Sequence, residues 1–323
     1  MAEPLRRRAR ASLLRVLSSA SSGPARSLVR VSLSGAAALA RFSRVEDVSL
    51  DNLRVAFGDE LSPRELRAIA SGMRRHTARI AGEWLELASA SRSPAAKARV
   101  LAWLERTVEY DASIARIDQL AAQQRGLLIV TGHLGNWELL AAALRQRGLD
   151  GAVIGRHRRN DSSSNWLVSM RAAIGVTTLP QDASPREALS ILRRGATLGI
   201  LCDLEVPRLA GEFVPFFGRP ALTMSAPAAL ARAAQLPLVP VRCVLRGKRY
   251  VMSVETPLEL DASLERQAAQ LDLLTRMNAV FERWIREDPI QWAWHQPRWR
   301  TAPPDGGGAG AHRVPLAARR TKR

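Results

Sequence analysis

The stretch GLLIVTGHLGNWELLAAALRQRG, residues 126–148, contains the change of pattern that decides the fold. It opens with a short, nearly continuous apolar run over 126–132, which is typical of a strand buried on both faces of a parallel sheet. Gly-Asn-Trp then interrupts the run, and apolar residues recur at helical spacing up to Gly148. The stretch therefore predicts a strand, a loop and a helix in succession, with Asn136 as the N-cap residue of the helix.

The same alternation of strands and helices continues toward the C-terminus. Residues 46–110, in contrast, have helical periodicity, and Ser62 and Pro63 are suited to begin one of these helices. This order predicts an α/β fold: a mostly parallel central sheet flanked by helices, with a helical N-terminal region. The remaining predicted elements are strands at 151–156 and 196–203, a hairpin around Gly247, and helices at 162–174, 184–195 and 264–287.

Charge divides the chain into three parts. The formal net charge is +18, and residues 1–45 hold nine arginines against one acidic residue, which gives +8. The tail 301–323 adds +4 and is rich in Pro, Gly and Arg, a composition typical of disorder. We therefore predict a basic membrane-associating arm at 1–45, one globular domain at 46–300 and a disordered basic tail at 301–323.

The N-terminal arm has three interpretations. Its longest apolar stretch is the ten residues 31–40, between Arg30 and Arg41, well short of the ~18–20 residues that a spanning helix needs. The arm resembles a cationic amphipathic segment that lies on a membrane surface, and this interpretation is favoured. An organellar transit peptide and a solvated, disordered arm are the alternatives.

His133 and Glu138 are five positions apart, a spacing that would separate them by roughly 140° on one continuous helix. This angle applies only if both residues are on the helix. If His133 lies in the loop beyond the strand and Glu138 in the first turn of the helix, the chain can bring the two side chains together. The carboxyl ends of parallel strands face the ligand crevice, so such a pair would form a general base. In the alternative interpretation His133 is a hydrogen-bonded structural residue and Glu138 only complements the helix dipole.

GHLGNWE resembles the His-x4-acid motif of the glycerolipid-type acyltransferase superfamily. Within it, the string has the form seen in the lipid A biosynthesis (lauroyl/myristoyl) acyltransferase family of Gram-negative bacteria. Other strings of that family occur before and after this motif in the expected order, so the resemblance covers about 50–300. These strings are DNLRVAF (51–57), GRHRRN (155–160), LGILCD (198–203) with FVPFF (213–217), and PIQWAWHQPRW (289–299).

The resemblance implies an acyltransferase domain at 46–300. Separately, the sequence indicates no cofactor. The domain would move a fatty acyl chain from acyl carrier protein or acyl-CoA to a hydroxyl of a phosphorylated glycolipid, a lipid A precursor. His133 would be the general base and Glu138 would hold the imidazole tautomer. A lysophospholipid or a mannosylated phosphoinositide is the alternative acceptor. The expected location is the cytoplasmic face of the bacterial inner membrane, peripheral or monotopic, on anionic lipids.

Five residues around this pair are expected to bind the substrate. Arginine forks suit phosphate groups, although solvated surface charges explain arginines equally well. Asp203 is expected to bind a sugar hydroxyl or to position an arginine, because it ends a strand on the side of the ligand crevice. A helix cap or a structural salt bridge is the alternative. The residues are Arg156, Asn160, Arg171, Asp203 and Arg208.

Two aromatic groups and the basic composition allow other interpretations. The string FVPFFG (213–218) suits an acyl channel, a membrane contact or the core, and Trp292, Trp294 and Trp299 suit a lipid interface or the core. A sequence pI of about 11.5 raises nucleic-acid binding, but aromatics are only 5% and the charge lies at the chain ends, so no nucleic-acid partner is expected. An intact His133/Glu138 pair argues against a catalytically inactive scaffold, and no histidine spacing indicates a metal site.

Overall fold

The computed structural model describes residues 44–156, 161–206 and 209–303. The predicted arm and tail, together with Asn160 and Arg208, fall wholly or almost wholly outside these residues. The predicted division into arm, domain and tail therefore stays a prediction. Among the described residues, no helix is both long enough and apolar enough to cross a bilayer.

The N-terminal region is helical, as predicted. It consists of α3 (Arg44–Phe57), α4 (Pro63–Ala88) and α5 (Pro94–Thr107), with short 3-10 turns at Gly58–Glu60 and Ser89–Ser91. Ser62 accepts a hydrogen bond from the backbone N–H of Glu65, whose side chain bonds back to Ser62. This capping box and Pro63 at the first position fix the start of the long helix α4.

Seven strands form the central sheet, in the order β1-β9-β8-β2-β5-β3-β4. All neighbouring pairs are parallel except β8 and β9, which form the predicted hairpin around Gly247. The prediction of a mostly parallel sheet flanked by helices is confirmed. The strands are β1 (Val108–Tyr110), β2 (Leu127–Thr131), β3 (Gly151–Gly155), β4 (Thr177–Pro180), β5 (Thr197–Leu201), β8 (Leu238–Arg246) and β9 (Arg249–Val254).

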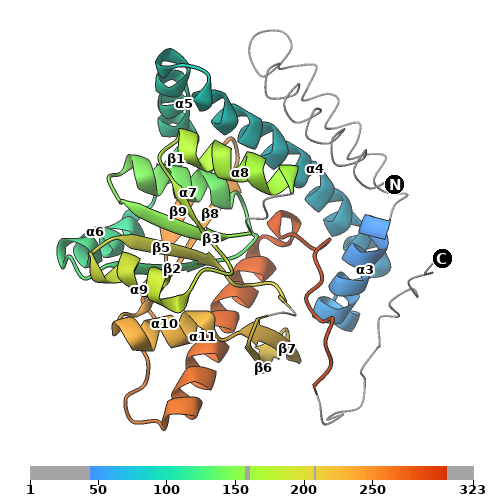
Figure 1. Cartoon of the computed structure of the whole chain (residues 1–323). Helices are drawn as coiled ribbons and strands as arrows, with labels where there is room; N and C mark the ends of the chain where they lie inside the picture. The colour runs from blue at the N-terminus through green and yellow to red at the C-terminus, as the bar shows by residue number, and fades with distance from the viewer. Residues whose placement is uncertain (1–43, 157–160, 207–208, 304–323) are drawn as a thin grey trace, which may run out of the picture.

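Helices cover both faces of this sheet (Figure 1). On β2, Leu128 and Val130 belong to one hydrophobic cluster while Leu127 and Ile129 belong to the other, as the two-residue period of a strand requires. Helices α9, α10 and α11 pack on the first face, and α5, α6, α7 and α8 pack on the second. Their bounds are α6 (Ala115–Ala122), α7 (Trp137–Gln146), α8 (Ser162–Ala173), α9 (Pro185–Arg193), α10 (Ala226–Ala234) and α11 (Arg266–Glu287).

Three strand features were not predicted. The edge strands β1 and β4 have three and four residues, too few to show a periodic pattern. The hairpin of β6 (Gly211–Phe216) and β7 (Arg219–Met224) contains the string that we considered as an acyl channel, a membrane contact or core. Phe216 and Phe217 are buried in it, so this part of the string belongs to the core.

The topology brings two strand ends together. Thr131, the last residue of β2, is in register with Leu201, the last residue of β5. His133 and Asp203 each lie two positions beyond these residues, at the same edge of the sheet. The fold therefore places an imidazole and a carboxylate, 70 residues apart in the chain, next to each other.

Candidate active site

His133 pairs with Asp203. The imidazole Nδ1 lies 2.8 Å from Oδ1 of the carboxylate, and the backbone N–H of His133 donates to Oδ2 at 2.7 Å. The indole Nε1 of Trp292 also donates to Oδ2, at 2.7 Å. Asp203 is 1% exposed, whereas the imidazole is 26% exposed. The buried carboxylate thus orients an imidazole whose other nitrogen, Nε2, remains for chemistry.

The electrostatics favour an ionised carboxylate. Burial by itself raises the pKa of Asp203, but the charge and hydrogen bonds of His133 and the bond from Trp292 outweigh it, so the pKa lies below its usual value. An ionised carboxylate accepts a proton-bearing Nδ1, which leaves Nε2 unprotonated in the neutral imidazole. This is the tautomer that a general base needs.

The predicted contact between Glu138 and the imidazole is wrong. Glu138 is 1% exposed and accepts two hydrogen bonds from Arg171, from Nε at 2.8 Å and from Nη2 at 2.6 Å. The start of α7 explains the difference: it turns Trp137 toward the imidazole, with ring centroids 4.9 Å apart. The local spacing suggested a carboxylate for His133, but Asp203 on another strand takes that place.

Arg171 is the buried counter-ion of Glu138. Burial lowers its pKa and the bonds and charge of Glu138 raise it, with a net increase. Gly155 leaves room for this guanidinium, because a Cβ at that position would lie 2.6 Å from Nη1. The alternative of a solvated surface charge is therefore wrong for Arg171, and its pairing with Glu138 does not favour the predicted role in phosphate binding. Arg156 differs: it follows β3 at the same sheet edge as His133 and is exposed.

The closing segment 291–296 lies against the loop that carries His133. The backbone N–H of Ala293 donates to the carbonyl of His133 at 3.1 Å, and Gly135 N–H donates to the Gln291 carbonyl at 3.1 Å. Asn52, from the string at 51–57, donates to the carbonyls of Trp294 and Gln296, both at 2.8 Å. The string at 51–57 therefore contacts the closing string, which in turn contacts the loop of His133.

Sequence reasoning missed two members of this site. Trp292 is buried, as the core alternative predicts, and its indole also donates a hydrogen bond to Asp203, which the sequence did not indicate. His295 is half-buried, and burial and then the charge of His133 lower its pKa. The spacing of the closing string, Trp-x-Trp-His, was the only available signal, and by itself it does not reveal a contact with position 203.

An apolar hollow lies behind Trp137, whose ring meets the imidazole of His133. It has a cavity volume of about 50 Å³ and lies between α7 and the strands β2, β5 and β3. It extends from Trp137, Thr131 and Leu201 near His133 to Gly151 and Thr197 at the other ends of the strands. Its lining is apolar, and Trp137, whose ring meets that of His133, forms one end of it.

A sequence model of the bacterial lipid A biosynthesis acyltransferase family matches residues 13–301. The chain belongs to this family. The match begins inside the basic N-terminal segment, earlier than the start near residue 50 that the quoted strings indicated. A search of the curated proteins found no match. The chain is therefore an acyltransferase, and its family implies an acyl donor and a lipid acceptor in general terms. Within the described ranges, no three His, Cys, Asp or Glu side chains form a group that could hold a metal ion.

His76 gives this acyltransferase a pH-dependent stability. Its ring Nε2 lies 3.2 Å from the carbonyl of Gly135, and burial lowers the pKa of His76 from 6.5 to about 4. Between these values the unfolded chain binds a proton that the folded protein does not, so the free energy of unfolding decreases as the pH falls, by up to roughly 3 kcal/mol. His76→Gln keeps a donor for the carbonyl and should flatten this pH dependence. Urea unfolding from pH 7 to pH 4 tests it, and equal slopes in both proteins would contradict the assignment.

Proposed function

We propose that this acyltransferase moves a fatty acyl chain from a thioester carrier to a hydroxyl of a phosphorylated glycolipid, with His133 as general base. The observation that carries the proposal is the His133–Asp203 pair, whose imidazole meets the ring of Trp137 in the lining of the apolar hollow. Acyl transfer requires both features: a base for the acceptor hydroxyl and an apolar site for the chain. A lipid A precursor is the proposed acceptor, with a lysophospholipid or a mannosylated phosphoinositide as the alternative.

The transfer proceeds by direct attack. Nε2 of His133 takes the proton of the acceptor hydroxyl while its oxygen forms a bond to the thioester carbonyl carbon. The carbon–sulfur bond then breaks, and the proton passes from Nε2 to the departing thiolate. Asp203 stays ionised throughout and stabilises the transient imidazolium. Arg156, exposed at the same edge, is placed to meet a phosphate of the acceptor.

The hollow would hold the acyl chain during this step, for which it has to widen from its volume of about 50 Å³. Trp137 both lines the hollow and touches the imidazole, so a chain inside it would present its carbonyl carbon beside His133. Acyl carrier protein and acyl-CoA both deliver such a thioester. The basic arm would keep the protein at the anionic cytoplasmic face of the bacterial inner membrane, where the acceptor lies.

Removal of either member of the pair should suppress acyl transfer. His133→Ala should lower kcat by about 10²- to 10⁴-fold, because it removes the general base. Asp203→Asn should lower kcat by roughly 10²-fold or more, because the amide no longer selects the required tautomer. The assay measures transfer of a lauroyl group from acyl carrier protein to a phosphorylated glucosamine disaccharide lipid. Asp272→Asn, on the exposed side of α11, is the matched control, and unchanged activity of His133→Ala would refute the proposal.

Narrowing the hollow should change the preferred chain length. Ala141 on α7 lines the hollow, and Ala141→Leu adds branched apolar volume there. We expect kcat/KM for a long acyl thioester to fall at least about tenfold relative to a short one, since contacts of single methylene groups are worth factors of that order. Ala68→Leu, on the exposed face of α4, is the control. An unchanged ratio of long to short chains would place the acyl group elsewhere.

The arm should bind anionic membranes through its charge. Changing the eight arginines between positions 6 and 41 to glutamine keeps the length and apolar residues of the arm. Binding to phosphatidylglycerol vesicles should weaken by at least about 100-fold, because each basic residue near such a surface contributes about 1 kcal/mol. The salt dependence of binding should decrease as well. Co-sedimentation with vesicles measures both, and equal binding of the two proteins would contradict the proposal.

A further inference from the structure

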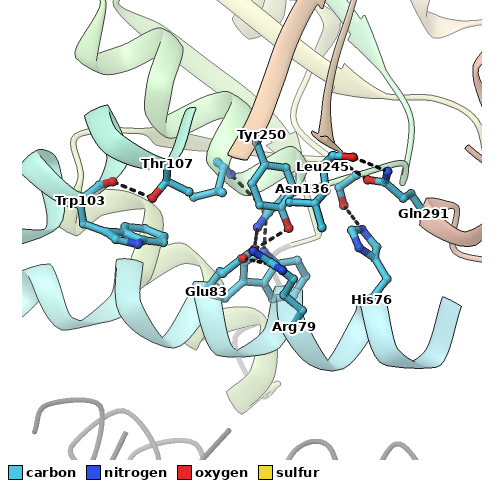
Figure 2. Close-up of polar contacts among 12 residues, drawn as sticks. His76, Arg79, Glu83, Trp103, Thr107, Asn136, Leu245, Tyr250 and Gln291 are labelled. Carbon is cyan, nitrogen blue, oxygen red and sulfur yellow. Dashed lines mark hydrogen bonds and ion pairs between the residues drawn. The ribbon is translucent and has the colours of Figure 1, made fainter. Parts of the chain in front are cut away.

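Helix α4 carries a buried carboxylate that the proposed reaction does not use. The side chain of Glu83 is only 8% exposed and accepts three hydrogen bonds. Oε2 accepts from Asn136 Nδ2 at 2.8 Å and from the hydroxyl of Tyr250 at 2.7 Å, while Oε1 accepts from Arg79 Nε at 2.9 Å. Figure 2 shows these side chains converging on the carboxylate between α4 and the sheet. A carboxylate so enclosed has a fixed position.

Asn136 connects this carboxylate to the loop of the active site. Its amide is 0% exposed, and its oxygen accepts from the backbone N–H of Leu139, which caps α7, and from the indole of Trp84. An asparagine amide has one donor end and one acceptor end. Because Glu83 can only accept, it turns the NH₂ group toward itself and the oxygen toward the helix start.

The neighbouring tryptophans extend the connection to the imidazole. Trp84 follows Glu83 on α4, and its ring meets that of Trp137 with centroids 5.3 Å apart. Trp137 follows Asn136, and its ring meets the imidazole of His133 at 4.9 Å. Glu83 therefore contacts Asn136 and Trp84 contacts Trp137. Trp137 in turn contacts His133, the proposed general base.

The loop has little freedom to compensate for a shift of Asn136. Gly135 has a φ of +63°, and a Cβ there would lie 2.0 Å from the carbonyl oxygen of Cys243. The backbone N–H of Asn136 donates to that same carbonyl at 2.9 Å. A displacement of the Asn136 side chain would therefore pass to Trp137 and to the imidazole.

We propose that Glu83 is a positioning residue for acyl transfer: through Asn136 it sets the start of α7 and thereby the place of the His133 imidazole. This inference rests on the proposed function. It predicts that the position of the acceptor oxygens of Glu83 matters, and that their negative charge does not. Misplacement of a catalytic group by about 1 Å can cost about 100-fold in rate, so the effect should appear in kcat.

Two conservative variants separate position from charge. Glu83→Gln keeps an oxygen where Oε2 accepts from Asn136 and Tyr250, and Arg79, 36% exposed, can turn its guanidinium to water. Its kcat should stay within about threefold of the wild type, since only the partly exposed ion pair is lost. Glu83→Asp keeps the charge but sets the oxygens back by one methylene group. Its kcat should fall about 10- to 100-fold with KM within about twofold.

The experiment measures lauroyl transfer from acyl carrier protein to a phosphorylated glucosamine disaccharide lipid by the full-length chain. Arg79→Ala is the control, because it removes a ligand of Glu83 and leaves Asn136 bound. Asn136→Ala, alone and combined with Glu83→Asp, gives a double-mutant cycle. If Glu83 acts through Asn136, the double variant should be no slower than Asn136→Ala alone.

The outcomes distinguish the inference from the proposed function. Wild-type kcat in Glu83→Asp, the reverse order of the two Glu83 variants, or additive effects in the cycle would overturn the positioning role. His133→Ala is assayed in parallel: if it transfers lauroyl groups as well as the wild type does, the proposed function fails instead. Far-ultraviolet circular dichroism of each variant confirms that the comparison concerns folded protein.

Discussion

The buried carboxylate of Asp203 is the group on which the site depends. A charge without exposure to water is stable only with compensating donors, and here two come from His133 and one from the indole of Trp292. Each donor belongs to a segment that must already be in place: the loop after β2 and the closing block. The carboxylate therefore couples the orientation of the imidazole to the assembly of the whole sheet edge.

The loop that presents the imidazole is irregular, so its backbone groups find partners in other elements. The partners are the carbonyl of Cys243 on β8, the carbonyl of Gln291 in the closing block and the ring of His76 on α4. Residues near both ends of the described domain thus complete a site at its centre. This arrangement explains why strings as distant as 51–57 and 289–299 accompany the motif around His133: Asn52 holds the carbonyls of Trp294 and Gln296.

Helix α7 separates two environments. Its first turn holds the buried ion pair of Glu138 and Arg171 and, at Trp137, the contact with the imidazole. Its later turns form one wall of the apolar hollow. An ion pair enclosed in this way contributes little net stability, but loss of one partner would leave a buried charge unpaired. In this geometry Glu138 pairs with Arg171, and Asp203 is the carboxylate that orients the His133 imidazole.

The sequence by itself determined the alternating strands and helices, the start of α4 at its capping box and the loop position of His133, because these depend on local periodicity and capping. It also contained the strings that indicated the family. Only the tertiary structure decided which carboxylate meets the imidazole, since Asp203 reaches it through the register of β2 and β5 and not through spacing along the chain. Other features likewise depend on contacts between segments that no local pattern describes. They are the short strands β1 and β4, the burial of Trp292 and the hydrogen bond from Asn136 to Glu83.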